Sequence, residues 1–147
     1  MYKFIIILHV LAATIWVGGH LFLAVILLPN ILKNKDFKAL LDFERKFEKI
    51  GIPALLVQVV TGFYLAYHLL PDVKSWFLFE GHLATHIGFK LLLLLATIFL
   101  AINANFRLIP NIEKGNNLKI MAVHIILVTL FSILFLVVGM SVRLDVI

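Results

Sequence analysis

Six histidines are the residues of this 147-residue chain whose type and placement could support cofactor chemistry. Two of them, His9 and His20, lie within residues 4–28, a stretch of 25 residues without Asp, Glu, Lys or Arg. These positions are 11 apart, which on an α-helix returns to within about 20° of the same face, about 16 Å further along the axis. The pair therefore predicts two imidazoles at two depths on one helix face. Because an ionisable side chain is costly inside a bilayer, each marks a candidate functional site.

The elements that must position these histidines are membrane-spanning helices. About 20 apolar residues cross a bilayer, and four stretches reach that length, at residues 4–28, 50–70, 83–105 and 118–140. Hydrophobic residues make up 63% of the chain and the mean hydropathy is +1.08, which excludes a soluble globular protein. We expect an all-α integral membrane protein in which residues 1–147 form a single four-transmembrane-helix bundle.

The segment between the first two spans, residues 29–49, combines apolar residues at helical spacing with a run of cations. Asp36 is placed to cap the N-terminus of a helix whose apolar face carries Phe37, Leu40, Leu41 and Phe47. Its cations are Lys33, Lys35, Lys38, Arg45, Lys46 and Lys49. The pattern predicts an amphipathic helix on the cytoplasmic surface of the membrane.

The loop cations predict the orientation. One side of the membrane receives the six cations above together with Arg107, Lys114 and Lys119. The other side receives Lys3, Lys74 and Arg143. Basic loops face the cytoplasm, so we expect a multi-pass protein of the bacterial cytoplasmic membrane with both termini extracytoplasmic. Orientation then accounts for the net charge of +5, and the lipid bilayer rather than nucleic acid is the expected partner.

This topology sorts the histidines into two levels. His20 and His124 are predicted in the inner half of the bundle, with His124 about 9 Å along the fourth span. The outer group comprises His9, His68, His82 and His86.

Two levels of imidazole favour two haem b groups, because haem b is held by axial histidines within an apolar bundle and needs no covalent link. The chain has no Cys, which excludes thiolate metal sites and covalent c-type haem attachment. His9 with His86 is the predicted outer ligand pair, with His82 or His68 as substitutes for His86. His20 with His124 is the predicted inner pair.

Two other readings of the histidines stay open. They could be structural residues satisfied by hydrogen bonds. They could instead bind Zn²⁺ or Cu²⁺ for transport, since both metals take imidazole. Few carboxylate ligands are available for such a site, because Asp72 and Glu80 are the only acidic residues near the outer histidines. The sequence also has no cluster of Met residues that could bind Cu⁺.

Lys90 lies inside the third span, four residues after His86 and hence on the same helix face. It either snorkels to the outer interface or serves as a cation that binds a carboxylate or propionate, or handles a proton. The other candidate propionate partners are Tyr64, Tyr67 and Trp76. In the second span Gln58, Thr61 and Gly62 share a face, which is typical of helix–helix packing.

Three stretches resemble the HemJ-type protoporphyrinogen oxidases and the related CopD-like membrane family. LHVLAATIWVGGHLFLAVILLP, with Trp16 seven residues after His9, is similar to their first span. KFEKIGIPALLVQVVTGFYLA is similar to their second span, and HIGFKLLLLL to their third. The resemblance implies a small helical bundle that binds haem b, with His9 as a ligand, Trp16 beside it and Lys90 as a functionally important cation. His20 and His124 match no position of that family.

We therefore expect a haem-dependent oxidoreductase, and three functions are open. The first is a dihaem b cytochrome that carries electrons between a quinol or similar donor and an acceptor. The second is porphyrinogen oxidation with one haem at His9 and with Lys90 gripping a substrate carboxylate. The third is a copper-handling or transport protein without haem. The sequence leaves the oligomeric state open, a homo-oligomer included.

The orientation can be tested with a reporter fused after Ile147. We expect extracytoplasmic activity of the reporter, since the majority of the loop cations lie on the opposite side. Alkaline phosphatase fused at this position should be active, whereas a reporter that works only in the cytoplasm should be inactive when fused at the same position. The reverse result would invert every depth assigned above.

Overall fold

The computed structural model describes residues 1–114 and 117–144, without the side chains of residues 142–144, so Arg143 lies outside the described side chains. The chain is all-α, and the described residues contain no strand. Its elements are α1 (Tyr2–Phe22), η1 (Leu23–Leu27), α2 (Leu28–Asn34), α3 (Phe37–Leu69), α4 (Ser75–Leu78), α5 (His82–Asn103), η2 (Ala104–Leu108), η3 (Ile109–Asn111) and α6 (Asn117–Leu144).

The predicted four-span architecture is confirmed. Four helical runs among the described residues are long and apolar enough to cross a membrane: Tyr2–Asn34, Phe37–Leu69, His82–Asn111 and Asn117–Ser141. The first two runs have 33 residues each, which corresponds to about 50 Å of helix. A bilayer core is about 30 Å thick, so these two helices extend well beyond the predicted spans.

Two prolines explain the irregular turns within the long runs. Pro29 opens α2 directly after the π-helical turn η1, and Pro110 lies in the 3₁₀ turn η3 directly after the π-helical turn η2. A proline ring clashes with the carbonyl four residues earlier. A wider π turn before each proline removes that clash and keeps the helical run continuous.

The predicted amphipathic segment is helical, but it is not a separate surface helix. Asp36 caps it as expected, accepting a hydrogen bond from the Ala39 backbone N–H at 3.0 Å. The helix then continues without a break through Pro53 to Leu69 as α3. Its apolar face packs on the bundle itself, where Leu40 is fully buried in a cluster with residues of α2 and α6. The segment is instead the first part of α3, because the backbone stays helical through Gly51 and Pro53.

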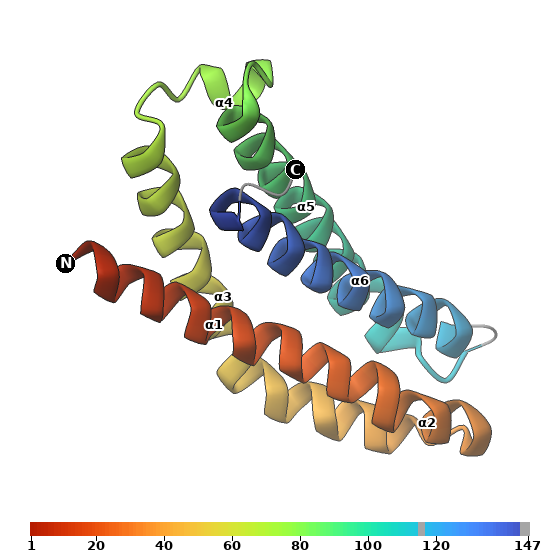
Figure 1. Ribbon diagram of the computed structural model, residues 1–147. Helices are drawn as coiled ribbons and strands as arrows, with labels where there is room; N and C mark the ends of the chain where they lie inside the picture. Colours follow the sequence, from red (N-terminus) through yellow and green to blue (C-terminus); the bar gives the residue numbers. More distant parts are fainter. Residues whose placement is uncertain (115–116, 145–147) are drawn as a thin grey trace.

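Helices α1 and α3 form a close pair along their length. Tyr2 contacts His68 near one end, with ring centroids 4.5 Å apart, and Phe22 stacks on Phe43 near the other, at 6.1 Å. Helix α6 packs against α5 and also reaches α1, where the Thr129 hydroxyl oxygen lies 3.2 Å from the His20 carbonyl oxygen. Figure 1 shows α5 and α6 side by side, with α4 at the end where α3 and α5 are joined.

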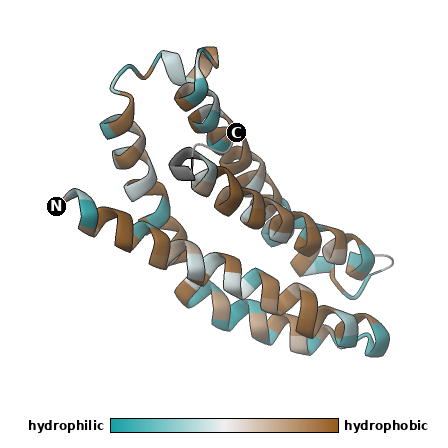
Figure 2. Ribbon diagram, in the orientation of Figure 1, coloured by the Kyte–Doolittle hydropathy of each residue, from teal (hydrophilic) through white to brown (hydrophobic). Residues whose placement is uncertain are grey.

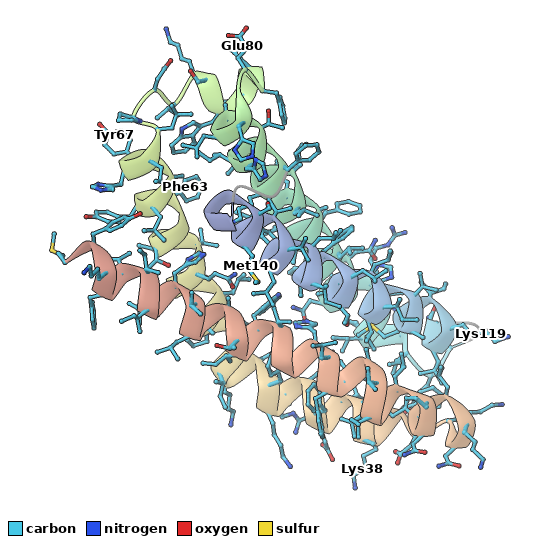
Figure 3. All side chains as sticks on the ribbon, in the orientation of Figure 1. Lys38, Phe63, Tyr67, Glu80, Lys119 and Met140 are labelled. Carbon is cyan, nitrogen blue, oxygen red and sulfur yellow. The ribbon has the colours of Figure 1, made fainter. Side chains whose placement is uncertain are left out.

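The surface of the bundle suits lipid. Figure 2 shows hydrophobic residues along the helices and hydrophilic residues gathered towards the loops. Large apolar side chains such as Phe99 and Val60 are 66% and 68% exposed. Lys38 and Lys119 lie near one end of the bundle and Glu80 at the other (Figure 3). The two basic loops therefore share an end, as the topology requires; we call it the basic end.

Phe47 fixes how closely α1 and α3 approach. A Cβ added at Gly19 would collide with the Phe47 ring, whereas a Cβ added at Gly18 would meet nothing within 4 Å. We expect Gly19→Ala to destabilise the protein by about 1–3 kcal/mol through overpacking. The matched change Gly18→Ala should be neutral or stabilising by up to about 1 kcal/mol, since Ala is the better helix former. Thermal unfolding of both variants in detergent tests this, and equal midpoints would contradict the packing.

Candidate cofactor-binding site

Two cavities lie inside the bundle. The larger, of about 440 Å³, is lined by α1, α3, α5 and α6 and by Trp76 of α4; we call it the large cavity. Its walls are mostly apolar, and Phe63 of α3 and Met140 of α6, labelled in Figure 3, belong to them. Its principal polar side chains are His9, Gln58, His86, Lys90 and Thr97.

The second cavity, of about 160 Å³, lies nearer the basic end of α3; we call it the small cavity. Its polar lining consists of His20, Glu44, Glu48, Asn105 and His124, with Thr97 at its boundary. Trp16, Leu55 and Thr97 line both cavities and so separate them. The structure thus places the predicted outer pair in one cavity and the predicted inner pair in the other, with Trp16 between them.

His9 is held in one tautomer by a hydrogen bond between α1 and α3. Its Nδ1 lies 2.8 Å from the Thr61 hydroxyl oxygen. That hydroxyl already donates to the Val57 carbonyl at 2.6 Å, so it must accept from His9. The Nδ1 of His9 therefore carries the proton, and its Nε2 keeps a lone pair. Metal-bound histidines are oriented in this way, with one ring nitrogen donating to a fixed acceptor.

The other three candidate ligands are oriented by their own helices. In His20, His86 and His124 the Nδ1 lies 2.7–3.0 Å from the carbonyl oxygen four residues earlier. A carbonyl can only accept, so each Nδ1 is the donor and each Nε2 has the lone pair. His124 differs in one respect, because its Nε2 is buried and has no hydrogen-bond partner among the described residues.

Lys90 reaches across the bundle to α6. A Cβ added at Gly139 would lie 3.0 Å from the Lys90 ammonium nitrogen and 3.6 Å from its Cε. The side chain thus lies against the backbone of α6 beside the large cavity, one helical turn after His86. Among the described residues no carboxylate contacts it. Its charge is therefore available to an anionic group in the cavity.

Glycines let the elements around the large cavity approach closely. A Cβ at Gly62 would lie 3.3 Å from His9 Cε1, and one at Gly88 would lie 2.9 Å from the Trp76 carbonyl oxygen. The Trp76 indole N–H donates to the Leu70 carbonyl at 2.9 Å, which ties α4 to the end of α3. Trp76 is 4% exposed and lines the cavity.

Four predicted residues lie outside both cavities. His68 is exposed and stacks between Tyr2 and Tyr64, at ring-centroid distances of 4.5 and 6.2 Å. His82 is exposed and lies 4.3 Å from the His86 ring, where its carbonyl orients His86. Tyr64 and Tyr67 also do not line the large cavity, unlike Lys90 and Trp76.

Several residues of the site were not predicted as functional. The sequence pattern of Thr61 and Gln58 predicts packing residues, yet Thr61 orients His9, and the buried side-chain amide oxygen of Gln58 has no hydrogen-bond partner among the described residues. Glu44 and Glu48 were placed on a surface helix, yet both line the small cavity. Their spacing of four residues on the face that also carries Phe37 and Phe47 was the signal available. Gly139 had no local signal.

Comparison with known proteins gave no match among family models, curated proteins or solved structures.

The His9–Thr61 hydrogen bond can be tested by removing its acceptor. Thr61→Val leaves the His9 Nδ1–H without a partner inside the bundle, and we expect a loss of about 1–3 kcal/mol in stability. Thr61→Ser keeps the hydroxyl group and should retain most of the wild-type stability. Thermal midpoints of the two variants give the comparison, and a Val variant as stable as the Ser variant would show that the bond is unimportant.

Proposed function

We propose that the protein is a haem b-dependent oxidoreductase of the membrane, with one haem in the large cavity. The observation that carries the proposal is the presence of two imidazoles, His9 and His86, on different helices around one apolar cavity. Each is fixed at Nδ1 by an acceptor and keeps its Nε2 lone pair for iron. The four-span bundle in a lipid bilayer fits such a protein.

The two cavities differ in how well they suit a macrocycle. Ligand cavities generally have about 300–1,000 Å³, and the large cavity, at about 440 Å³, falls in this range. The small cavity, at about 160 Å³, does not. The second haem that we expected at His20 and His124 stays a prediction, and the volume of the small cavity does not support it. Our proposal therefore uses one haem.

The residues of the chain have separate tasks in this proposal. His9 and His86 would hold the iron, Thr61 and the His82 carbonyl fix their rings, and Lys90 would pair with a propionate. A bound haem b would supply one-electron chemistry. Apolar walls and the Trp16 ring keep water from the site. Because the cavity lies among membrane-spanning helices, the electron donor that suits it is a lipophilic molecule such as a quinol.

Porphyrinogen oxidation is the second candidate, favoured by the position of Lys90. The ammonium group lies at the same cavity as His9 and has no carboxylate partner among the described residues. A porphyrinogen carries carboxylates that could pair with this charge. Lys90→Met should then raise the substrate concentration needed for turnover while leaving the haem bound.

Copper handling gains less support. Across residues 1–114 and 117–144, no group of three or more His, Asp or Glu side chains is placed to hold a metal ion. A haem iron needs only two axial imidazoles from the protein, so the same geometry does not count against haem.

Haem content tests the proposal. Protein purified after expression with ample haem supply should contain about one haem b per chain by the pyridine haemochrome assay, with a low-spin bis-histidine spectrum. His9→Ala should lose this spectrum, because the variant lacks one of the two axial ligands. His68→Ala is the matched control, since His68 is exposed and does not line the cavity.

The stoichiometry separates the alternatives. Two haems per chain, one of them lost in both His20→Ala and His124→Ala, would restore the dihaem cytochrome and refute the single-haem assignment. A colourless protein under the same conditions would contradict haem binding altogether.

A further inference from the structure

The small cavity has a chemical character that the proposed haem site does not use. Its lining carries two carboxyl groups, Glu44 and Glu48 on α3, and two imidazoles, His20 on α1 and His124 on α6. Asn105 of η2 is a further polar side chain there. From α5 the cavity receives Thr97 and apolar residues, and none of the described lining residues is a Lys or Arg.

The groups that face this cavity are mostly acceptors. Both imidazoles donate through Nδ1 to backbone carbonyls of their own helices, so each turns an Nε2 lone pair to other partners. His124 Nε2 is buried and unpartnered. A buried acceptor without a donor costs about 1–3 kcal/mol. The lining of the small cavity therefore favours a molecule that donates hydrogen bonds and interacts favourably with acidic groups.

The size and geometry of the cavity narrow the choice of occupant. A volume of about 160 Å³ holds several water molecules, each of which takes about 30 Å³ in the liquid. The described His and acidic side chains form no cluster that could ligate a metal ion. Water fits the volume of the cavity and needs no cluster of metal ligands. It also carries exchangeable protons and donates hydrogen bonds to both imidazole and carboxylate groups.

The position of the cavity links two parts of the molecule. Glu44 and Glu48 lie on α3 about two and three helical turns after the Asp36 cap, which is at the basic end. Trp16, Leu55 and Thr97 form the wall shared with the large cavity. His20 stacks on Trp16 with ring centroids 4.5 Å apart, and Phe47 packs edge-on against His20 at 5.3 Å.

We propose that the small cavity is a proton-exchange site that serves the large cavity. Glu44 and Glu48 exchange protons with water at the basic end, and the Nε2 atoms of His20 and His124 accept them inside. A quinol releases one proton for each electron that it gives, and each electron that enters the large cavity is balanced by one proton that the small cavity binds from water at the basic end. That proton is released when the electron leaves to an acceptor. A nearby positive charge lowers the free energy of an added electron in an apolar interior.

Proton exchange at the carboxyl groups can be tested without any haem. Dicyclohexylcarbodiimide is an apolar reagent that reacts with protonated carboxyl groups, and peptide mass spectrometry locates its adducts. We expect adducts at Glu44 or Glu48 that diminish as the pH rises. Asp42 is the internal control, because it lies on the same helix but is exposed and outside the cavity. Equal labelling of Asp42, or no labelling of either glutamate, would overturn the proton-exchange site.

The coupling rests on the proposed function and needs a second measurement. Haem-loaded protein in weakly buffered nanodiscs with a pH-sensitive dye should take up protons when it is reduced by a one-electron donor that carries no proton, such as reduced methyl viologen. Glu44→Gln and Glu48→Gln should at least halve this uptake, Glu44→Asp should restore it, and Asp42→Asn should leave it unchanged.

The carbodiimide labelling and the proton-uptake measurement test different hypotheses, so a negative result in one does not decide the other. Wild-type protein without haem would refute the proposed function, while the carbodiimide result would still decide whether the small cavity exchanges protons. Haem-loaded Glu44→Gln and Glu48→Gln proteins with wild-type proton uptake would refute the coupling and leave the haem site intact.

Discussion

The hydrogen bond between His9 and Thr61 is the interaction on which the large cavity depends. It joins the N-terminal part of α1 to the C-terminal part of α3. It also determines the tautomer of His9. The Thr61 hydroxyl donates its proton to the Val57 carbonyl, so it can only accept a hydrogen bond from the His9 ring. In an apolar bundle no water competes for either group. One contact therefore serves both the packing of the helices and the orientation of a candidate iron ligand.

Close helix contacts around this bond require small residues. Gly62 gives room to the His9 ring, and Gly19 and Gly51 give room to Phe47 between α1 and α3. In membranes helices associate by packing rather than by leaving water, so small residues at contacts have a large effect. Gly139 follows the same rule on α6, where the absence of a side chain makes space for the Lys90 ammonium group.

The two cavities divide the bundle by chemistry. The large cavity has apolar walls and few polar groups, two of them the imidazoles of His9 and His86. The small cavity is smaller and carries two carboxyl groups beside two imidazoles. Trp16 lies between them, 9% exposed, and contacts the small cavity through His20. If haem binds in the large cavity and protons exchange in the small cavity, as we propose, charge can be balanced within one bundle.

The sequence by itself determined the four spans, the division of the histidines into two groups and the Asp36 helix cap. These follow from local properties: the length of apolar stretches, the helical repeat and the types of residue at helix ends. The tertiary structure decided that His9 contacts Thr61, 52 positions away, that Lys90 lies against Gly139, and that Glu44 and Glu48 line the same cavity as His20 and His124. It also decided that residues 37–69 form one helix and that the two cavities differ in volume. These depend on which helix faces meet and how closely, and in an apolar bundle that is set by shape complementarity between residues far apart in the chain.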